Sequence, residues 1–434
     1  MTRARARAGA DRLRAGDGPI LRLTLLLLLL TAAAQSPLTA LLPGAAWTNV
    51  LDDLAALAAF ACAAPRLLRA PLAIVAGAAV WTVVLAFAAT RSTLPPGETL
   101  VVARQVLVPV LLVLVGTSLR PEEWHAVRRA TIVVGVGNAC YALLELAGVH
   151  LLDPTALSTF NADRMVLRDG LPAYYSYWFG PGSPLGALGT DHVVRTGGTL
   201  LNPPVAGLVA AAALVFAWHE RELRGRRVVL VLVSLSTATA LARGGFVVAA
   251  AALGLSALAA RVGRVGTVIA AVPLIWFAAT QLADDGDSAS HSDGLAYGVR
   301  RAFETGVGEG FGHAGNLAKA SGLAEASESL AGIAFAAAGL PALVLVAWLL
   351  LRCALAATGP GACWEHGLAV GVVVASAFSE SAGALNGAAP LWLGVGVALA
   401  SLPSASQTAD AGDLWGPRRT ARATRTASTT SVTA

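Results

Sequence analysis

Charged side chains are scarce in this chain, and lysine is almost absent. Only 13% of the 434 residues are Asp, Glu, Lys or Arg, whereas soluble globular domains carry about 25%. Lys319 is the single lysine among 31 cationic residues, so the others are arginines. Together with a hydrophobic content of 56%, the low charge excludes an ordinary soluble domain. No nucleic-acid partner is expected.

Cysteine is equally scarce, with four residues in the whole chain. They lie in or beside apolar segments and lack the paired spacing of zinc ligands. We therefore expect no disulfide, no metal site and no cofactor. The four positions are Cys62, Cys140, Cys353 and Cys363.

Long apolar runs fill the chain from end to end. A helix needs about 20 apolar residues to cross about 30 Å of hydrocarbon, and such runs recur between short polar or proline-containing breaks. The pattern predicts an all-α integral membrane protein with about twelve transmembrane helices. The expected spans are residues 20–42, 47–64, 71–90, 99–118, 129–150, 197–218, 228–242, 244–260, 265–282, 329–351, 366–384 and 387–403.

Arginine placement predicts the orientation, because loops that stay in the cytoplasm keep their cations. With the N-terminus inside, the predicted inner segments, which include both termini, hold 22 of the 31 cationic residues, so both termini are expected to be cytoplasmic. We predict a basic N-terminus over 1–19, a multispan membrane domain over 20–403 and a disordered tail over 404–434 that contacts membrane lipid. Two long loops, 151–196 and 283–328, are expected outside. The excess of Arg and Ala points to a GC-rich bacterium and its cytoplasmic membrane.

Arg243 lies in the run STATALARGGFVVAAAALGLSAL, far from other charges. A charge at that depth costs about 2.5 kcal/mol or more, so the guanidinium should face a polar cavity. The alternative is a short outer hairpin capped by one snorkelling arginine.

The two long loops are expected to carry function. The first contains clustered aromatic rings, which either anchor the loop at the membrane interface or stack on sugars. The second has alternating glycines without a preceding strand, which excludes a dinucleotide fingerprint. The aromatic residues are Tyr174, Tyr175, Tyr177, Trp178 and Phe179, and the glycines are Gly306, Gly308, Gly310 and Gly312.

Four segments carry a resemblance to a known family. RTGGTLLNPPVAG, residues 195–207, resembles the Arg, Gly, Thr, Asn-Pro signature of the O-antigen ligase and polymerase family. ALARGGF, GVRRAFETGVGEGFG and ESLAGIAFAAAGLPALVLV then resemble the Ser-Arg-Gly element, the Arg-then-Gly-x-Gly loop and the span after the large loop of that family, in the same order. The resemblance covers residues from about 195 to 400.

The resemblance implies an inverting, metal-independent membrane glycosyltransferase of the GT-C-like kind. Such an enzyme transfers a glycan from a polyprenyl diphosphate carrier to a glycan or lipid hydroxyl acceptor, as a polymerase or ligase. The resemblance also assigns Arg195 and Arg243 as catalytic residues that bind the diphosphate. Negative charge grows on the leaving phosphate, and fixed guanidinium groups, which bind phosphate bidentately, suit that task.

Further residues are substrate-binding candidates. Arg300 and Arg301 lie in the second long loop and either contact substrate or form solvated surface. Asn202, followed by Pro203 and Pro204, is expected to break a helix and expose carbonyls and its amide to a cavity. The family usually has Asn where this chain has Pro204.

The acceptor hydroxyl must lose a proton, which calls for a base. The family's ligases place a histidine at the entry to the span after the large loop, where this chain has Glu328. Glu328 is therefore expected as the catalytic base, with Glu325 and His313 as neighbouring substrate-binding candidates and Glu380 as a second polar wall. Otherwise Glu328 is a helix-start acid that meets the helix dipole. The missing histidine favours a polymerase, or an acceptor other than lipid A.

Other functions are weighed against the transferase. A secondary transporter or lipid-linked glycan flippase also fits the spans and the buried Arg104. Carriers built from repeats show interrupted spans in both halves, and the Asn-Pro-Pro break near residue 202 has no counterpart. A purely structural partner would tolerate substitution of Arg195 or Arg243. Asp52 and Asp53 are alternatively read as a metal-type acidic motif of other lipid-linked glycosyltransferases.

Overall fold

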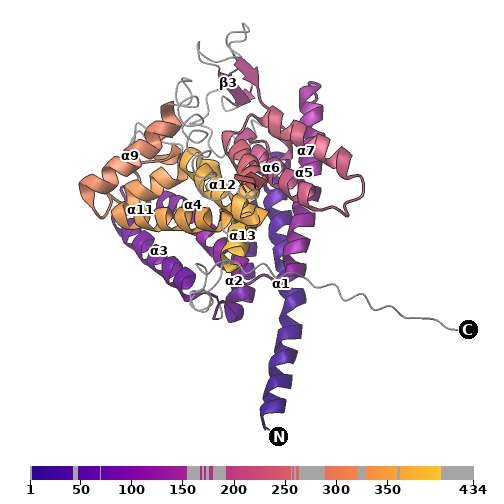
Figure 1. Ribbon diagram of the computed structural model, residues 1–434. Coiled ribbons are helices and arrows are strands. Elements are labelled where there is room, and N and C mark those ends of the chain that lie inside the picture. Colours follow the sequence, from indigo (N-terminus) through magenta and orange to yellow (C-terminus); the bar gives the residue numbers. More distant parts are fainter. Residues whose placement is uncertain are drawn as a thin grey trace, which may run out of the picture. The chain divides into compact units, whose positions relative to one another are not determined.

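The computed structural model divides the chain into two units, Met1–Ala400 and Ser401–Ala434. The first contains every helix and strand described below (Figure 1). The structure describes residues 2–42, 47–68, 70–153, 167–168, 171–172, 175–178, 192–255, 257–258, 261–262, 289–320, 329–358 and 362–401.

Helices dominate the described residues. Two 3₁₀ helices, η4 (Gly198–Leu200) and η5 (Glu380–Gly383), lie among them. The α-helices are α1 (Thr2–Leu41), α2 (Thr48–Leu67), α3 (Leu72–Thr90), α4 (Pro96–Thr117), α5 (Pro121–Leu146), α6 (Pro203–His219), α7 (Arg226–Ala240), a helix at Arg243–Leu255, α9 (Ala289–Thr305), α10 (Asn316–Ala320), α11 (Leu330–Ala357), α12 (Trp364–Phe378) and α13 (Leu385–Ala400).

The only strands within the described residues lie in the first predicted long loop. β1 (Leu167–Arg168) pairs antiparallel with β2 (Leu171–Pro172). β3 (Ser176–Trp178) pairs antiparallel with β4 (His192–Val194), with Tyr177 opposite Val193.

Five helices among the described residues are long and apolar enough to cross a membrane. They are Gly18–Leu41, Leu72–Thr90, Pro96–Thr117, Pro121–Leu146 and Leu330–Ala357. Four shorter apolar helices accompany them, namely Pro203–His219, Arg243–Leu255, Trp364–Phe378 and Leu385–Ala400. The prediction of a mostly helical protein is confirmed, and these apolar helices are consistent with a membrane-embedded one. The total of twelve spans stays a prediction, and residues 265–282 lie outside the described ranges.

Helix starts differ from the predicted boundaries for local reasons. The span expected from residue 129 begins at Pro121, because Glu123 Oε2 accepts the Arg120 N–H at 2.8 Å and closes the first turn. The span expected from residue 197 begins at Pro203, because the chain first forms η4. Leu201 ends that turn in the left-handed conformation, with φ 52°. The second predicted loop contains α9 and α10.

Small residues bring the helices close together. A Cβ on Gly135 of α5 would lie 2.3 Å from the Cβ of Ala213 in α6. A Cβ on Gly396 of α13 would lie 2.1 Å from the carbonyl oxygen of Val113 in α4. Such approaches are typical of packing between membrane helices. Helix α6 is buried along most of its length, which places it in the core.

α11 is broken near its middle. Gly339 has φ 70° and ψ −150°, a conformation essentially restricted to glycine. Pro341 has no N–H to reach the carbonyl of Ala337, and Leu340 donates outside the helix. The carbonyls of Ala336 and Ala337 therefore lack their usual helical donors.

The glycine-rich loop 306–310 supplies the missing hydrogen bonds. The N–H groups of Glu309 and Gly310 donate to the two open carbonyls at 2.9 and 3.0 Å, and Gly306 accepts from Leu340 at 2.9 Å. Helix α9, which precedes this loop, lies along α11 (Figure 1). The alternating glycines thus have a structural role in completing a discontinuous helix.

Candidate active site

Two consecutive glycines let the signature segment, residues 195–207, pass close to other side chains. Gly198 has φ +58°, and a Cβ there would lie 2.2 Å from Asn138 Oδ1. A Cβ on Gly197 would lie 2.2 Å from the hydroxyl of Tyr175. These separations exclude any larger residue without rearrangement, so the packing requires the glycine pair.

Polar side chains of α5 and α7 hold this segment in place. The Gly198 N–H donates to Glu145 Oε2 at 2.7 Å. The Thr199 hydroxyl donates to Asn138 Oδ1 at 3.3 Å, and Asn138 Nδ2 donates to Ser236 Oγ at 3.4 Å. Asn138, Glu145 and Ser236 are buried. The segment is therefore fixed by hydrogen bonds within the helical core.

The residue after Arg195 is bonded directly to the end of α7. The Thr196 N–H donates to the Thr239 carbonyl at 3.2 Å, and the two hydroxyl oxygens are 2.9 Å apart. Arg243 follows Thr239 by four residues and begins the helix Arg243–Leu255. Arg195 and Arg243 are both half-buried. The structure thus brings the chain segments of the two arginines together.

Tyr175 connects the first long loop to Arg195. Its carbonyl accepts the Arg195 N–H at 2.7 Å, and its side chain is buried. It is the member of the predicted aromatic cluster whose side chain lies within the described residues. This ring packs on the signature segment through Gly197.

Glu380 lies where α12 gives way to η5, close to the start of the Arg243 helix. The Cβ of Ser379, its neighbour, lies 3.7 Å from a Cβ placed on Gly244. Glu380 Oε2 accepts the Asn316 N–H at 3.0 Å, which links η5 to α10. An acidic residue therefore lies beside the start of the Arg243 helix, and its carboxylate is bonded to α10.

Four helices begin close to one another at this place, which we call the junction. A Cβ on Gly245 would lie 2.5 Å from the Gly207 carbonyl oxygen, so the Arg243 helix and α6 start together. A Cβ on Gly387 of α13 would lie 2.5 Å from Val205 of α6. Gly383 of η5 is similarly close to Leu330, the first residue of α11. Helix N-termini carry partial positive charge, so the junction can hold an anion such as a phosphate group.

Asn202 is the N-cap of α6. Its Oδ1 accepts the Val205 N–H at 3.3 Å, and Pro203 and Pro204 occupy the first helical positions. The predicted interruption is present at this residue. The amide oxygen, however, bonds within the helix start, as an N-cap does.

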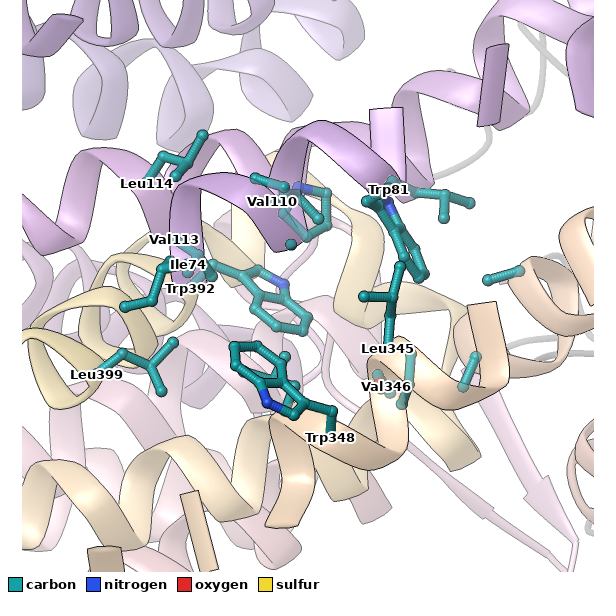
Figure 2. Close-up of a pocket in the computed structure, with 18 of the residues that line it drawn as sticks. Ile74, Trp81, Val110, Val113, Leu114, Leu345, Val346, Trp348, Trp392 and Leu399 are labelled. Carbon is teal, nitrogen blue, oxygen red and sulfur yellow. The ribbon is translucent and has the colours of Figure 1, made fainter. Parts of the chain in front are cut away.

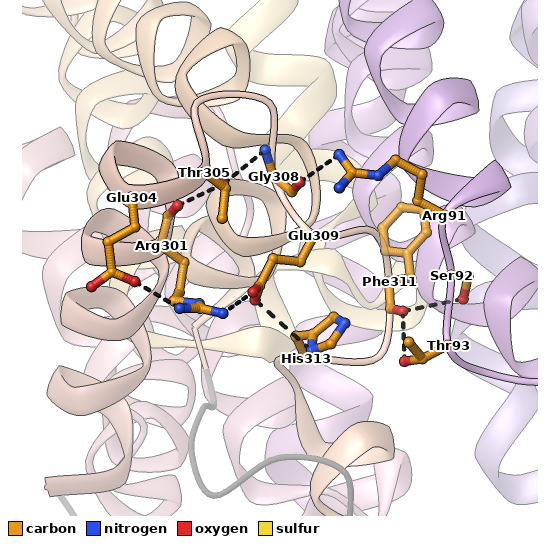
Figure 3. A network of polar contacts seen from close by, with 10 residues as sticks. All are labelled: Arg91, Ser92, Thr93, Arg301, Glu304, Thr305, Gly308, Glu309, Phe311 and His313. Atoms are coloured by element: carbon orange, nitrogen blue, oxygen red, sulfur yellow. Dashed lines mark hydrogen bonds and ion pairs between the residues drawn. The ribbon is translucent and has the colours of Figure 1, made fainter.

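Arg301 and His313 belong to a polar network that holds the glycine-rich loop in place (Figure 3). Arg301 Nη1 lies 2.7 Å from Glu304 Oε2, and Arg301 Nη2 contacts Glu309 Oε1. His313 Nδ1 lies 3.8 Å from Glu309 Oε2. Burial, and then the Arg301 guanidinium, lower the pKa of His313. Arg301 therefore has protein partners, which gives it a structural role in addition to the predicted substrate contact.

The same network reaches the turn between α3 and α4. Arg91 Nη1 donates to the Gly308 carbonyl at 2.6 Å, and the Phe311 carbonyl accepts the hydroxyls of Ser92 and Thr93 at 3.2 and 3.3 Å (Figure 3). Arg300, the neighbouring candidate, is 66% exposed and stacks on Tyr297. Its side chain lies on the surface of α9.

Two predicted residues, Glu325 and the base candidate Glu328, lie outside the described residues. Ser329 directly follows Glu328 and caps α11, because its Oγ accepts the Gly332 N–H at 2.9 Å. Leu330 then contacts η5 at the junction.

An apolar cavity opens between α3, α4, α11 and α13 (Figure 2). It has an empty volume of about 780 Å³, including space open to the surroundings, and three tryptophans line it. Trp81 and Trp392 donate their ring N–H groups to backbone carbonyls at 3.2 and 2.7 Å, so their rings present apolar surface. The lining includes Leu330 and extends to Trp348, so the cavity runs from the start of α11 past its break.

Asn138 and Glu145 were not predicted as site residues. They lie seven positions apart, on one face of α5, and both are polar within a predicted span. Polar residues in a span are functional candidates by default. That pairing is the signal in the sequence that points to them.

Comparison with known proteins adds no relative. No protein-family model, no curated protein and no solved structure matches the chain.

Proposed function

We propose that this protein is a bacterial membrane glycosyltransferase that moves a glycan from a polyprenyl diphosphate carrier to a glycan or lipid hydroxyl. The transfer is inverting and metal-independent, and it takes place at the outer face of the cytoplasmic membrane. The observation that carries the proposal is the pair of bonds between Thr196 and Thr239. They hold the segments of Arg195 and Arg243 together beside four helix starts.

The chemistry needs cations where charge develops. The bond between the sugar C1 and the phosphate oxygen breaks, its electron pair stays on the diphosphate, and the acceptor oxygen bonds to C1. Arg195, Arg243 and the partial positive charge at the helix starts of the junction stabilise the growing negative charge. Arg300 contacts substrate at the edge of the site, whereas Arg301 and His313 position the glycine-rich loop. Asn202 orders the start of α6.

The acceptor hydroxyl gives its proton to Glu328, with Glu325 as its neighbour. Glu328 directly precedes the capping residue of α11, whose first residue meets the junction. Glu380 forms the opposite polar wall. The apolar cavity beside the start of α11 receives part of the hydrocarbon chain of the carrier, because its lining is almost entirely apolar and begins at Leu330, next to the junction.

The test is glycan transfer by purified protein in liposomes that contain a polyprenyl diphosphate-linked glycan and an acceptor. Arg243→Lys and Arg195→Lys keep the charge but lose the bidentate fork, so each should lower transfer by at least about tenfold. Arg224→Lys is the matched control, since Arg224 is exposed in the turn before α7. It should leave transfer unchanged.

Normal transfer in both folded Arg→Lys variants would refute the proposal. A secondary transporter or flippase is the alternative, and it would move substrate across the bilayer without making a glycosidic bond. Arg104, the cation within a predicted span that also fits this alternative, already has a protein partner. Its Nη1 lies 2.9 Å from Asp53 Oδ2.

A further inference from the structure

Two adjacent carboxylates of α2, Asp52 and Asp53, lie at a level where, among the described side chains, only one guanidinium, that of Arg104 in α4, forms an ion pair with them, through Asp53. Arg104 Nη1 lies 2.9 Å from Asp53 Oδ2, and the two side chains are 31% and 21% exposed. Asp52 is 0% exposed, and its Oδ1 accepts the Asp53 N–H at 3.0 Å. Asp52 Oδ2 and Asp53 Oδ1 are buried and have no hydrogen-bond partner. We call these three residues the triad.

The formal charges of the triad do not cancel. Two ionised carboxylates and one guanidinium leave a single negative charge within packed helices. An unbalanced buried charge costs several kcal/mol, and such groups are normally paired or neutralised. The two unpartnered oxygens are the places where a compensating positive charge can bind.

The helices packed against α2 supply no further cation at that level. Among the described side chains of α1, α4 and α13, the charged residues outside the triad are Arg22 and Glu98. Arg22 lines a cavity with Glu123, which pairs with Arg66 near the other end of α2. That end lies about 20 Å along the helix from Asp52. Glu98 is half-buried in the first turn of α4 and is itself acidic.

We propose that Asp52 and Asp53 together bind one exchangeable proton, which makes the triad an electrically neutral proton site inside the membrane domain. The proton resides on one of the two unpartnered oxygens, Asp52 Oδ2 or Asp53 Oδ1, while Arg104 stays ionised. This site is independent of the proposed transfer reaction. Charged groups in membrane domains typically mark proton or ion pathways.

Charge counting makes the proposal testable by infrared spectroscopy of the full-length protein in lipid nanodiscs at about pH 7. When the spectrum of Asp52→Asn is subtracted from that of the wild type, the difference should contain the C=O stretch of one protonated carboxyl. Asp53→Asn should give the same loss, because either variant leaves one carboxylate to balance the charge of one guanidinium. Arg104→Met should double the signal, since both carboxyls are then protonated. Asn has the shape of a protonated Asp, which favours folding of the first two variants.

Arg104→Lys and Glu98→Gln are the matched controls, and both should leave the triad signal unchanged. Absence of the protonated-carboxyl signal from both Asn difference spectra would overturn the proposal. Loss of the wild-type signal on adding NaCl would also overturn it, because a metal cation would then hold the place of the proton.

Discussion

Glu145 Oε2 accepts a 2.7 Å hydrogen bond from the backbone N–H of Gly198. The bond joins the end of α5 to the turn that leads into α6, and both residues are buried. Arg195 lies three residues before Gly198. The position of a candidate catalytic arginine therefore depends on a carboxylate in another helix.

Replacing Glu145 with Ala should destabilise the protein by about 1–3 kcal/mol, because the buried Gly198 N–H loses its acceptor. Thermal unfolding in detergent measures this change, and the transfer assay should show a parallel loss. Glu145→Gln keeps an acceptor oxygen and should have a smaller effect. Glu122→Ala, at an exposed position of α5, is the control. Equal unfolding temperatures for Glu145→Ala and Glu122→Ala would show that the bond contributes nothing.

Gly198 can be compared with Gly225, which has a similar backbone conformation. Their φ values are +58° and +67°, but a Cβ on Gly225 meets nothing within 4 Å. Gly225→Ala should therefore destabilise the fold only by the energy of placing Ala in the left-handed conformation, about 1–2 kcal/mol. Gly198→Ala adds the overlap with Asn138 and should be clearly more destabilising, with a lower expression of folded protein and a lower unfolding temperature. A similar fall in unfolding temperature for both variants would show that the residues around Gly198 move to accommodate a Cβ at little energetic cost.

Local patterns in the sequence were enough to predict most helices. Long apolar runs predict α3, α4 and α11 because each helix must satisfy its own backbone in hydrocarbon. Pro203 and Pro204 likewise predict the start of α6. These features depend on residues that are neighbours in the chain.

Contacts between distant segments could not be predicted in the same way. Nothing near Gly308 indicates that its loop completes the backbone bonds of α11, which is broken at Gly339. The helix α9 also replaces an expected loop. A Cβ on its Gly298 would lie 2.4 Å from the Gly332 carbonyl oxygen of α11, so its stability depends on a partner helix.

The loop that completes α11 can be tested with two of its glycines. Gly306 and Gly308 have φ +71° and +78°, but only a Cβ on Gly308 would approach another residue, at 2.3 Å from the Ala337 carbonyl oxygen. Gly308→Ala should displace the loop and expose the open carbonyls of α11, which would increase protease cleavage of the loop several-fold. Gly306→Ala should show only the smaller effect of backbone strain. Equal cleavage of the two variants would contradict the role given to the loop.

Glu328→Gln tests the proposed base. A general base contributes about 10²–10⁴-fold to the rate, so kcat for transfer should fall by that order while donor binding changes little. Steady-state kinetics and a separate donor-binding measurement distinguish the two effects. Glu222→Gln, at an exposed turn position, should match the wild type. An equal loss of kcat and donor affinity would instead indicate a structural role for Glu328.

His313 should make stability depend on pH. Burial and the Arg301 guanidinium lower its pKa, and the nearby Glu309 does not offset them because Arg301 already binds that carboxylate. The folded protein therefore binds fewer protons at this site than the unfolded chain does, so stability falls as pH drops below the ordinary value of about 6.5. His313→Gln should show a smaller fall in unfolding temperature between about pH 7.5 and pH 5.5 than the wild type. His150→Gln, at an exposed position after α5, should behave as the wild type does. An unchanged pH dependence in His313→Gln would assign the effect to other groups.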